Sequence, residues 1–130
     1  MTAATRTSGG RKDSAVAFLR LAAAGKTREA FGTFVSARFV HHNPFFRGNA
    51  ASLAAGMAEN ARANPEKTLE IQHVLEDGDL VAVHSRVRMK PDDLGIAVIH
   101  LFRFSDGLIM ELWDIAQPVP ADAQNEQGMF

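Results

Sequence analysis

The sequence contains no cysteine, little excess of charge of either sign and no long apolar run. Without cysteine, a disulfide framework, a thiolate zinc site, an iron–sulfur cluster and a cysteine nucleophile are all excluded. Fourteen basic residues stand against 15 acidic ones, for a formal net charge of −1. This balance argues against a general nucleic-acid-binding protein, which needs clustered lysine and arginine to neutralise phosphates.

Other signals are missing as well. No apolar run approaches the roughly 18 residues that a membrane-spanning helix needs. The N-terminal segment lacks the apolar core of a secretory signal, so we expect a cytoplasmic protein without a membrane partner. There is no glycine-rich phosphate loop and no pair of histidines at metal-binding helical spacing, so we expect neither a cofactor nor a metal.

The length and composition predict one domain. A chain of 130 residues with 46% hydrophobic residues can bury a single core. Residues 1–12 are small, polar or basic without periodicity, and we expect them to form a flexible arm. Residues 13–130 then form the domain, with an extended C-terminal tail from Pro118 onward.

The spacing of apolar residues changes from helical to alternating near the middle of the chain. It predicts helices over residues 13–25, 27–35 and 49–64. Gly25 is expected to end the first, Thr27 to cap the second, and Asn49 or Ser52 to open the third. A short extended piece over 38–42 precedes the third helix. Four strands are predicted over residues 68–75, 80–89, 96–104 and 108–115. This order indicates an α+β fold in which the helices cover one face of a strongly curved, mainly antiparallel sheet.

Side chains alternate across a strand, and this alternation places the candidate chemistry on one face of the sheet. His100 and Phe102 share a face of one strand, while Met110, Leu112 and Asp114 share a face of the next. We expect both faces to turn inward, because the opposite faces carry charged residues whose unpaired burial would be costly.

The turn between these two strands determines whether the two polar residues meet. A three-residue loop would pair Phe104 with Leu108 and make His100 and Asp114 diagonal neighbours. A two-residue loop would pair His100 with Trp113 on opposite faces, which the apolar pattern disfavours. An imidazole beside a carboxylate can move a proton near neutral pH, so this pair is the catalytic candidate. The alternative is that His100 is a hydrogen-bonded core residue.

Four segments of the chain form a recognisable set: Phe39-Val40-His41-His42-Asn43-Pro44, Val83-His84-Ser85, Phe102-Arg103 with Asp106-Gly107, and Glu111-Leu112-Trp113-Asp114 with Gln117-Pro118-Val119-Pro120. With these segments the chain resembles the SnoaL-like family, which belongs to the nuclear-transport-factor-2-like, or cone-shaped α+β barrel, superfamily. The resemblance extends from about residue 13 to the C-terminal end. It implies N-terminal helices packed in a curved sheet whose open end leads into an apolar pocket.

The resemblance also implies functional residues. It places His42 and Asn43 near the pocket, where they would bind substrate beside the apolar Phe102, Met110 and Leu112. Asn43 could instead only build a turn, because a proline follows it. Relatives commonly carry Asp at position 100, which in ketosteroid isomerase is the oxyanion-hole acid, and often His at position 112. This chain has His and Leu at these positions, so the usual pair is altered.

The outer face of the predicted sheet offers a surface for self-association. Trp113, Glu111, His84 and Arg86 point away from the helices by alternation, beside apolar residues that a monomer would expose. We therefore expect a homodimer through this face.

Two functions of different classes follow from the sequence. The first is a small cofactor-independent enzyme, an isomerase, aldol-type cyclase or hydrolase, that acts by acid–base catalysis on an apolar small molecule. The alternative is a non-catalytic binding or accessory protein with the same pocket.

Overall fold

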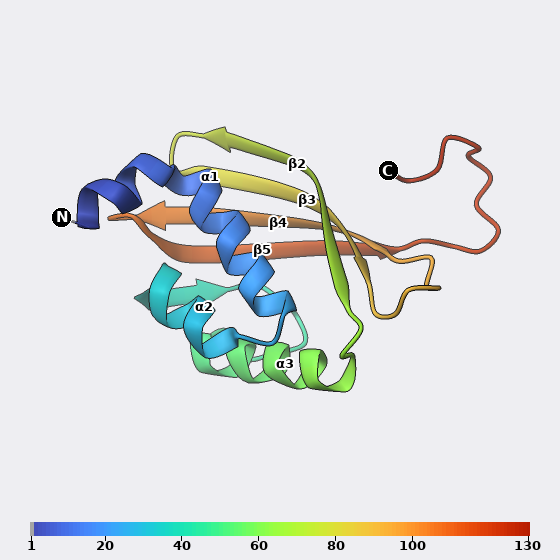
Figure 1. The fold of residues 1–130 in the computed structure, drawn as a ribbon, viewed down its shortest axis with the longest axis horizontal. Coiled ribbons are helices and arrows are strands. Elements are labelled where there is room, and N and C mark those ends of the chain that lie inside the picture. Colours follow the sequence, from blue (N-terminus) through green and yellow to red (C-terminus); the bar gives the residue numbers. More distant parts are fainter. Residues whose placement is uncertain (1) are drawn as a thin grey trace.

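The computed structural model describes the backbone of residues 2–130 and the side chains from residue 10 onward. Figure 1 shows the helices packed against one face of a single curled sheet, as the α+β expectation requires. In chain order the elements are α1 (Thr2–Ala23), α2 (Thr27–Phe34), β1 (Val35–His41), α3 (Ala50–Ala63), β2 (Thr68–Asp77), β3 (Leu80–Arg88), β4 (Ile96–Ser105) and β5 (Leu108–Pro118).

The sheet has the strand order β1-β5-β4-β3-β2. The strands β2 to β5 form an antiparallel meander, while β1 pairs with β5 in parallel. The extended piece expected over 38–42 is this strand, and it begins as early as Val35, where α2 ends. Because its partner lies about 70 positions later in the chain, local pattern could not indicate the pairing.

The expected helix ends at Gly25 and Asn49 are confirmed, whereas the expected cap at Thr27 is not. At Gly25, φ is 85° and the Lys26 N–H donates to the Leu21 carbonyl at 2.8 Å, which ends α1 in the expected way. At the start of α3, the Asn49 side chain accepts a hydrogen bond from the Ser52 N–H at 2.8 Å. The prediction that Thr27 caps α2 is wrong, because the capping position is Lys26 and no side chain accepts a bond there.

The first helix begins earlier than Asp13. It is interrupted at Gly10, where φ is 73° and ψ is −179°, and Arg11 and Lys12 already belong to its second part. Arg11 forms an ion pair with Glu76 at 3.3 Å. The flexible arm predicted over residues 1–12 falls largely outside the described side chains and stays a prediction.

The core lies between α1 and the inner face of the sheet. Phe18 of α1 is fully buried and packs edge-on against Phe102 of β4, with ring centroids 5.9 Å apart. Burial of an aromatic ring of this size contributes about 2–3 kcal/mol relative to exposure. The alternation expected to turn His84 and Arg86 outward is confirmed in β3, since the residues between and beside them are buried: Val81, Val83, Ser85 and Val87.

The chain beyond β5 turns back along the molecule. The Val119 N–H donates to the Gly95 carbonyl at 3.0 Å, which continues the pairing past the strand end. At the end of the chain, the ring of Phe130 lies 4.6 Å from the Arg86 guanidinium and stacks on His84. The tail therefore contacts the outer face of the sheet.

Candidate functional site

His100 and Asp114 lie directly opposite each other on β4 and β5. The predicted diagonal arrangement is wrong, because the loop has two residues, Asp106 and Gly107, both with positive φ. A bulge after this turn shifts the register by one residue, so that Phe104 faces Ile109 but Arg103 faces Glu111. The shift returns His100 and Asp114 to the same face of the sheet.

Asn43, in the loop after β1, holds the carboxylate of Asp114. Its Oδ1 accepts a hydrogen bond from the Phe45 N–H at 2.9 Å, so its amide group must face Asp114. From there Nδ2 donates to Asp114 Oδ1 at 3.2 Å and to Oδ2 at 2.9 Å. Asn43 therefore builds the predicted turn, and the same side chain contacts the candidate catalytic group. Its role in substrate binding stays a prediction.

His41 stabilises the same loop from the other side. It is buried, its Nδ1 accepts the Asn43 N–H at 3.1 Å, and its Nε2 lies 2.6 Å from the Arg47 carbonyl. The acceptor role of Nδ1 requires Nε2 to carry the proton and to donate to Arg47. His41 is thus a structural residue that sets the path of the loop.

A cavity of about 440 Å³ opens beside the His100–Asp114 pair. This volume is suited to a small organic molecule. Its polar lining consists of Asn43, Asn60, Lys67, His100 and Asp114. Most of the remaining wall is apolar and comes from the loop after β1, from α3 and from the open end of the sheet: Phe45, Phe46, Leu53, Met57, Val87, Met89, Ile96 and Val98.

His100 is neutral at neutral pH. Burial lowers its pKa from 6.5 to about 4, although the charge of Asp114 acts in the opposite direction; the charge of Lys67 lowers it further. The Nδ1 atom of His100 is buried and has no hydrogen-bond partner among the described residues. The neutral imidazole carries one N–H donor and one acceptor nitrogen.

Comparison with known proteins identifies the family. The model of the SnoaL-like domain matches residues 15–112. The chain belongs to the SnoaL-like family. Curated proteins provide no match.

Solved structures share the SnoaL-like fold at low identity. An NTF2-like protein of unknown function from Cytophaga hutchinsonii is 17% identical, with a TM-score of 0.65 over 82% of this chain and 88% of that one. A proposed polyketide cyclase from Bacillus cereus is 21% identical, with a TM-score of 0.70 over 81% and 72%. Another from Sinorhizobium meliloti is 17% identical, with a TM-score of 0.63 over 77% and 92%. These likenesses show the fold alone.

Four of the residues predicted for the SnoaL-like site lie outside the cavity lining. Phe102 and Leu112 are deeper in the core, where both are almost fully buried. Met110 lies at the bulge of β5, which takes it out of the inward alternation that was expected. His42 follows β1 on the outer side of the sheet, stacked on Trp113 with ring centroids 5.0 Å apart. Of the predicted set, His100, Asp114 and Asn43 come together.

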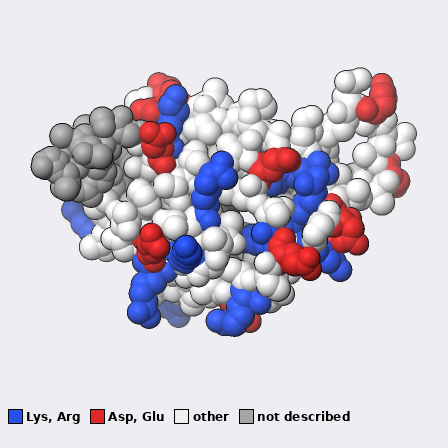
Figure 2. Space-filling model, viewed as in Figure 1, with Lys and Arg blue, Asp and Glu red and all other residues white. Residues whose placement is uncertain are grey.

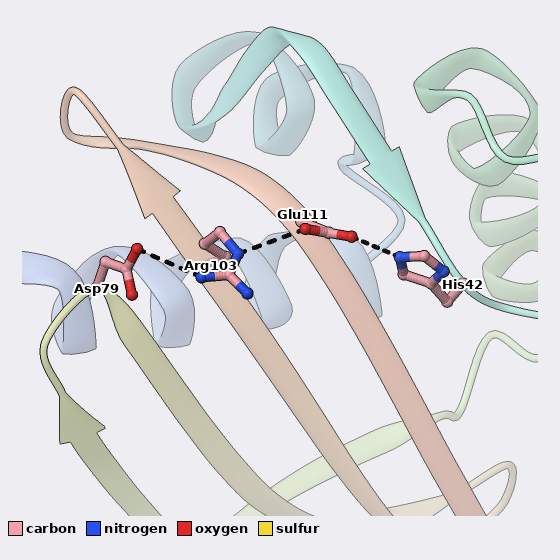
Figure 3. Close-up of polar contacts among 4 residues, drawn as sticks. All are labelled: His42, Asp79, Arg103 and Glu111. Carbon is pink, nitrogen blue, oxygen red and sulfur yellow. Dashed lines mark hydrogen bonds and ion pairs between the residues drawn. The ribbon is translucent and has the colours of Figure 1, made fainter.

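His42 instead ends a polar chain on the outer face. Figure 3 shows its Nε2 beside Glu111, which in turn meets Arg103, and Arg103 reaches Asp79. The three distances are 2.6, 3.4 and 3.5 Å. Hydrogen bonding from His42 and Arg103 lowers the pKa of the Glu111 carboxyl, against a smaller effect of burial. These four residues lie on the surface opposite the cavity.

Sequence reasoning missed two polar residues of the SnoaL-like cavity lining, Asn60 of α3 and the charged Lys67. Lys67 precedes β2 in a short loop, where its position relative to the pocket depends on the packing of α3 against the sheet. No strand or helix periodicity applies to a loop residue, so the sequence offered no signal for it.

Other kinds of site find no support in the described part of the chain. No three histidine or acidic side chains gather there as a metal site would require. None of the described helices is long and apolar enough to cross a membrane. On the helix-bearing face, Figure 2 shows acidic and basic side chains intermixed rather than gathered by sign.

Proposed function

We propose that this chain is a small cofactor-independent enzyme that performs acid–base catalysis on an apolar molecule bound in the cavity. The observation that carries the proposal is the direct cross-strand pairing of His100 with Asp114 beside the cavity that both line. Asn43 supports it, because its amide donates to both carboxylate oxygens and so orients Asp114 beside the cavity.

The chemistry follows from the two groups. A carboxylate oxygen of Asp114 removes a proton from a carbon next to a carbonyl, and the electron pair of that C–H bond moves to the carbonyl oxygen as an enolate. The N–H of neutral His100 donates a hydrogen bond to this oxygen. Return of the proton to another carbon completes an isomerisation, and attack of the enolate carbon on a second carbonyl completes an aldol-type ring closure. A hydrolase would use Asp114 to activate water instead.

Enolisation is the step that isomerisation and ring closure share, and it can be tested with a simple ketone. We expect the wild-type chain to accelerate exchange of the α-protons of 2-tetralone in D2O, followed by proton NMR. Asp114→Asn preserves the shape and removes the base, so it should lower this rate by about 10²–10⁴-fold. Asp92→Asn, at an exposed position outside the cavity, is the matched control and should leave the rate unchanged.

The alternative function is a binding protein without turnover. It predicts that the ketone binds saturably while exchange is no faster than in buffer with either wild type or Asp114→Asn. Equal exchange rates for wild type and Asp114→Asn would also contradict the role of Asp114 as the base.

We further propose that two copies associate through the outer face of the sheet. Ile99 of β4 and Ile115 of β5 are paired across the strands and are 38% and 72% exposed. Two residues further along β4, Leu101 pairs with Trp113 of β5 on the same face. The two pairs form an apolar stripe along the two strands. Such a stripe supports a self-complementary contact, since two-fold association places the same surface on both sides.

A further inference from the structure

Lys67 is held with its ammonium group at the cavity. Its backbone N–H donates to the Asn64 carbonyl at 3.0 Å, which closes a turn after α3. Its Nζ donates to the Asn60 Oδ1 at 2.6 Å, and both residues line the cavity. The lysine is therefore positioned by one hydrogen bond from its backbone and one from its ammonium group.

The charge of Lys67 has no partner of opposite sign. Among the residues that the structure describes, no carboxylate lies within 4.0 Å of its Nζ, and this includes Asp114 in the same cavity. Burial lowers the pKa of Lys67, because the ammonium has lost part of its water. A partly buried charge without a counterion is unusual, since such charges are normally paired.

We propose that Lys67 binds a carboxylate of the ligand, so that the substrate class is an apolar carboxylic acid rather than a neutral molecule. This inference rests on the proposed function only in placing the ligand in the same cavity. Folding has already removed part of the water from the Lys67 ammonium. An anion that binds there therefore gains electrostatic attraction, and little additional free energy is lost to desolvation of Lys67. A charge-assisted bond from Nζ to a carboxylate oxygen would provide this gain.

Lys67 and Asp114 line the same cavity without contacting each other, so each can contact a different part of the ligand. The negative charge of Asp114 repels an anion, so the carboxylate of the ligand belongs at Lys67. The apolar body would then lie along the wall formed by Phe46, Met57 and Val98. Asp114 remains available for the carbon or water that loses a proton, and Lys67 orients the molecule toward it.

Two probes of the same shape test this directly: 2-naphthoate, which is charged, and 2-naphthamide, which is neutral. Binding to the full chain is measured by calorimetry at neutral pH and constant ionic strength. One charge-assisted hydrogen bond predicts that wild type binds the carboxylate roughly 10-fold more tightly than the amide. Lys67→Met should abolish the preference by weakening carboxylate binding while amide binding is kept.

Three further variants make the result specific. Lys67→Gln removes the charge with a polar side chain, and it replaces Lys67→Met if circular dichroism shows that the methionine variant is unfolded. Lys67→Arg keeps the charge and should keep part of the preference. Lys90→Met removes a lysine that is exposed and outside the cavity lining, and should behave as wild type.

The outcomes separate this inference from the proposed function. Equal affinities for the two probes in wild type, a preference that survives both neutral variants, or binding of neither probe would overturn the role of Lys67. Activity is not part of this measurement, so a failure of Asp114→Asn to slow proton exchange would overturn the proposed catalysis without changing the expected carboxylate preference.

Discussion

The amide nitrogen of Asn43 lies against both carboxylate oxygens of Asp114, at 3.2 and 2.9 Å, across an interval of 71 residues in the chain. The contact joins the loop after β1 to β5, and its direction is determined by the turn that Asn43 makes with the Phe45 N–H. The same residue thus shapes the mouth of the cavity and orients the group that we propose as the base.

Asn43→Asp separates these two roles. An aspartate keeps an oxygen for the Phe45 N–H but replaces the amide donor by a second carboxylate beside Asp114. We expect the fold to be retained and the exchange rate of 2-tetralone to fall by about 10-fold or more, because repulsion displaces or protonates the base. The rate is measured by NMR as for Asp114→Asn, and a rate equal to wild type would show that Asn43 does not orient the base.

The buried His100 predicts a specific dependence of stability on pH. Because folding lowers its pKa from 6.5 to about 4, the folded chain binds fewer protons than the unfolded chain between these values. The contribution to stability is therefore complete above the unfolded pKa and is lost as pH falls toward the folded pKa. We expect the free energy of unfolding to fall by about 2–3 kcal/mol over this window, measured by urea denaturation.

Other groups also titrate in this range, so the difference between variants is the informative quantity. His100→Leu removes the titrating imidazole, so the free energy of unfolding of this variant should fall less with falling pH than that of wild type. If His100→Leu loses stability with falling pH as steeply as wild type, burial of the neutral imidazole is not the cause.

Gly56 of α3 makes room for the ring of Phe46 at the cavity. A Cβ at position 56 would overlap the ring, but Phe46 is 40% exposed on a loop and can move. We expect Gly56→Ala to change the free energy of unfolding by less than about 1 kcal/mol, since alanine also favours the helix. The affinity for 2-naphthamide should fall severalfold because the displaced ring alters the wall.

Gly32 of α2 provides the control for this change. A Cβ there meets no atom within 4 Å, so Gly32→Ala should leave probe affinity unchanged. Wild-type affinity in Gly56→Ala would mean that the Phe46 ring does not contact the bound probe.

Ile115→Glu tests the proposed association of two copies. A charge at this largely exposed position should produce monomers without unfolding the chain, because the side chain contributes little to the core. Sedimentation velocity at micromolar concentration measures the change. Leu75→Glu, which is also exposed but lies on β2, distant from the Ile99–Ile115 pair in the strand order, is the comparison and should leave the dimer intact. A monomeric wild type would contradict the proposal.

The local elements were predictable from the sequence because their signals are local. Glycine at position 25 and asparagine at 49 mark helix ends through backbone groups within a few residues, and both predictions are confirmed. The strict alternation in β3 required only that one face be buried. The same reasoning placed His100 and Asp114 on one face, even though the assumed loop length was wrong.

The composition of the site was decided by tertiary structure. A two-residue turn and a bulge in β5 together changed a diagonal pair into a direct one. The bulge also removed Met110 from the inward face, since one extra residue reverses the side of the residues between it and the turn. The parallel pairing of β1 with β5 carried His42 to the outer surface and Asn43 to the cavity. Lys67 reached the cavity only through the packing of α3. The sequence alone determined which segments are helices and strands, because those preferences act over a few residues. Contacts between segments 30 to 70 residues apart depend on register and packing, which no local pattern encodes.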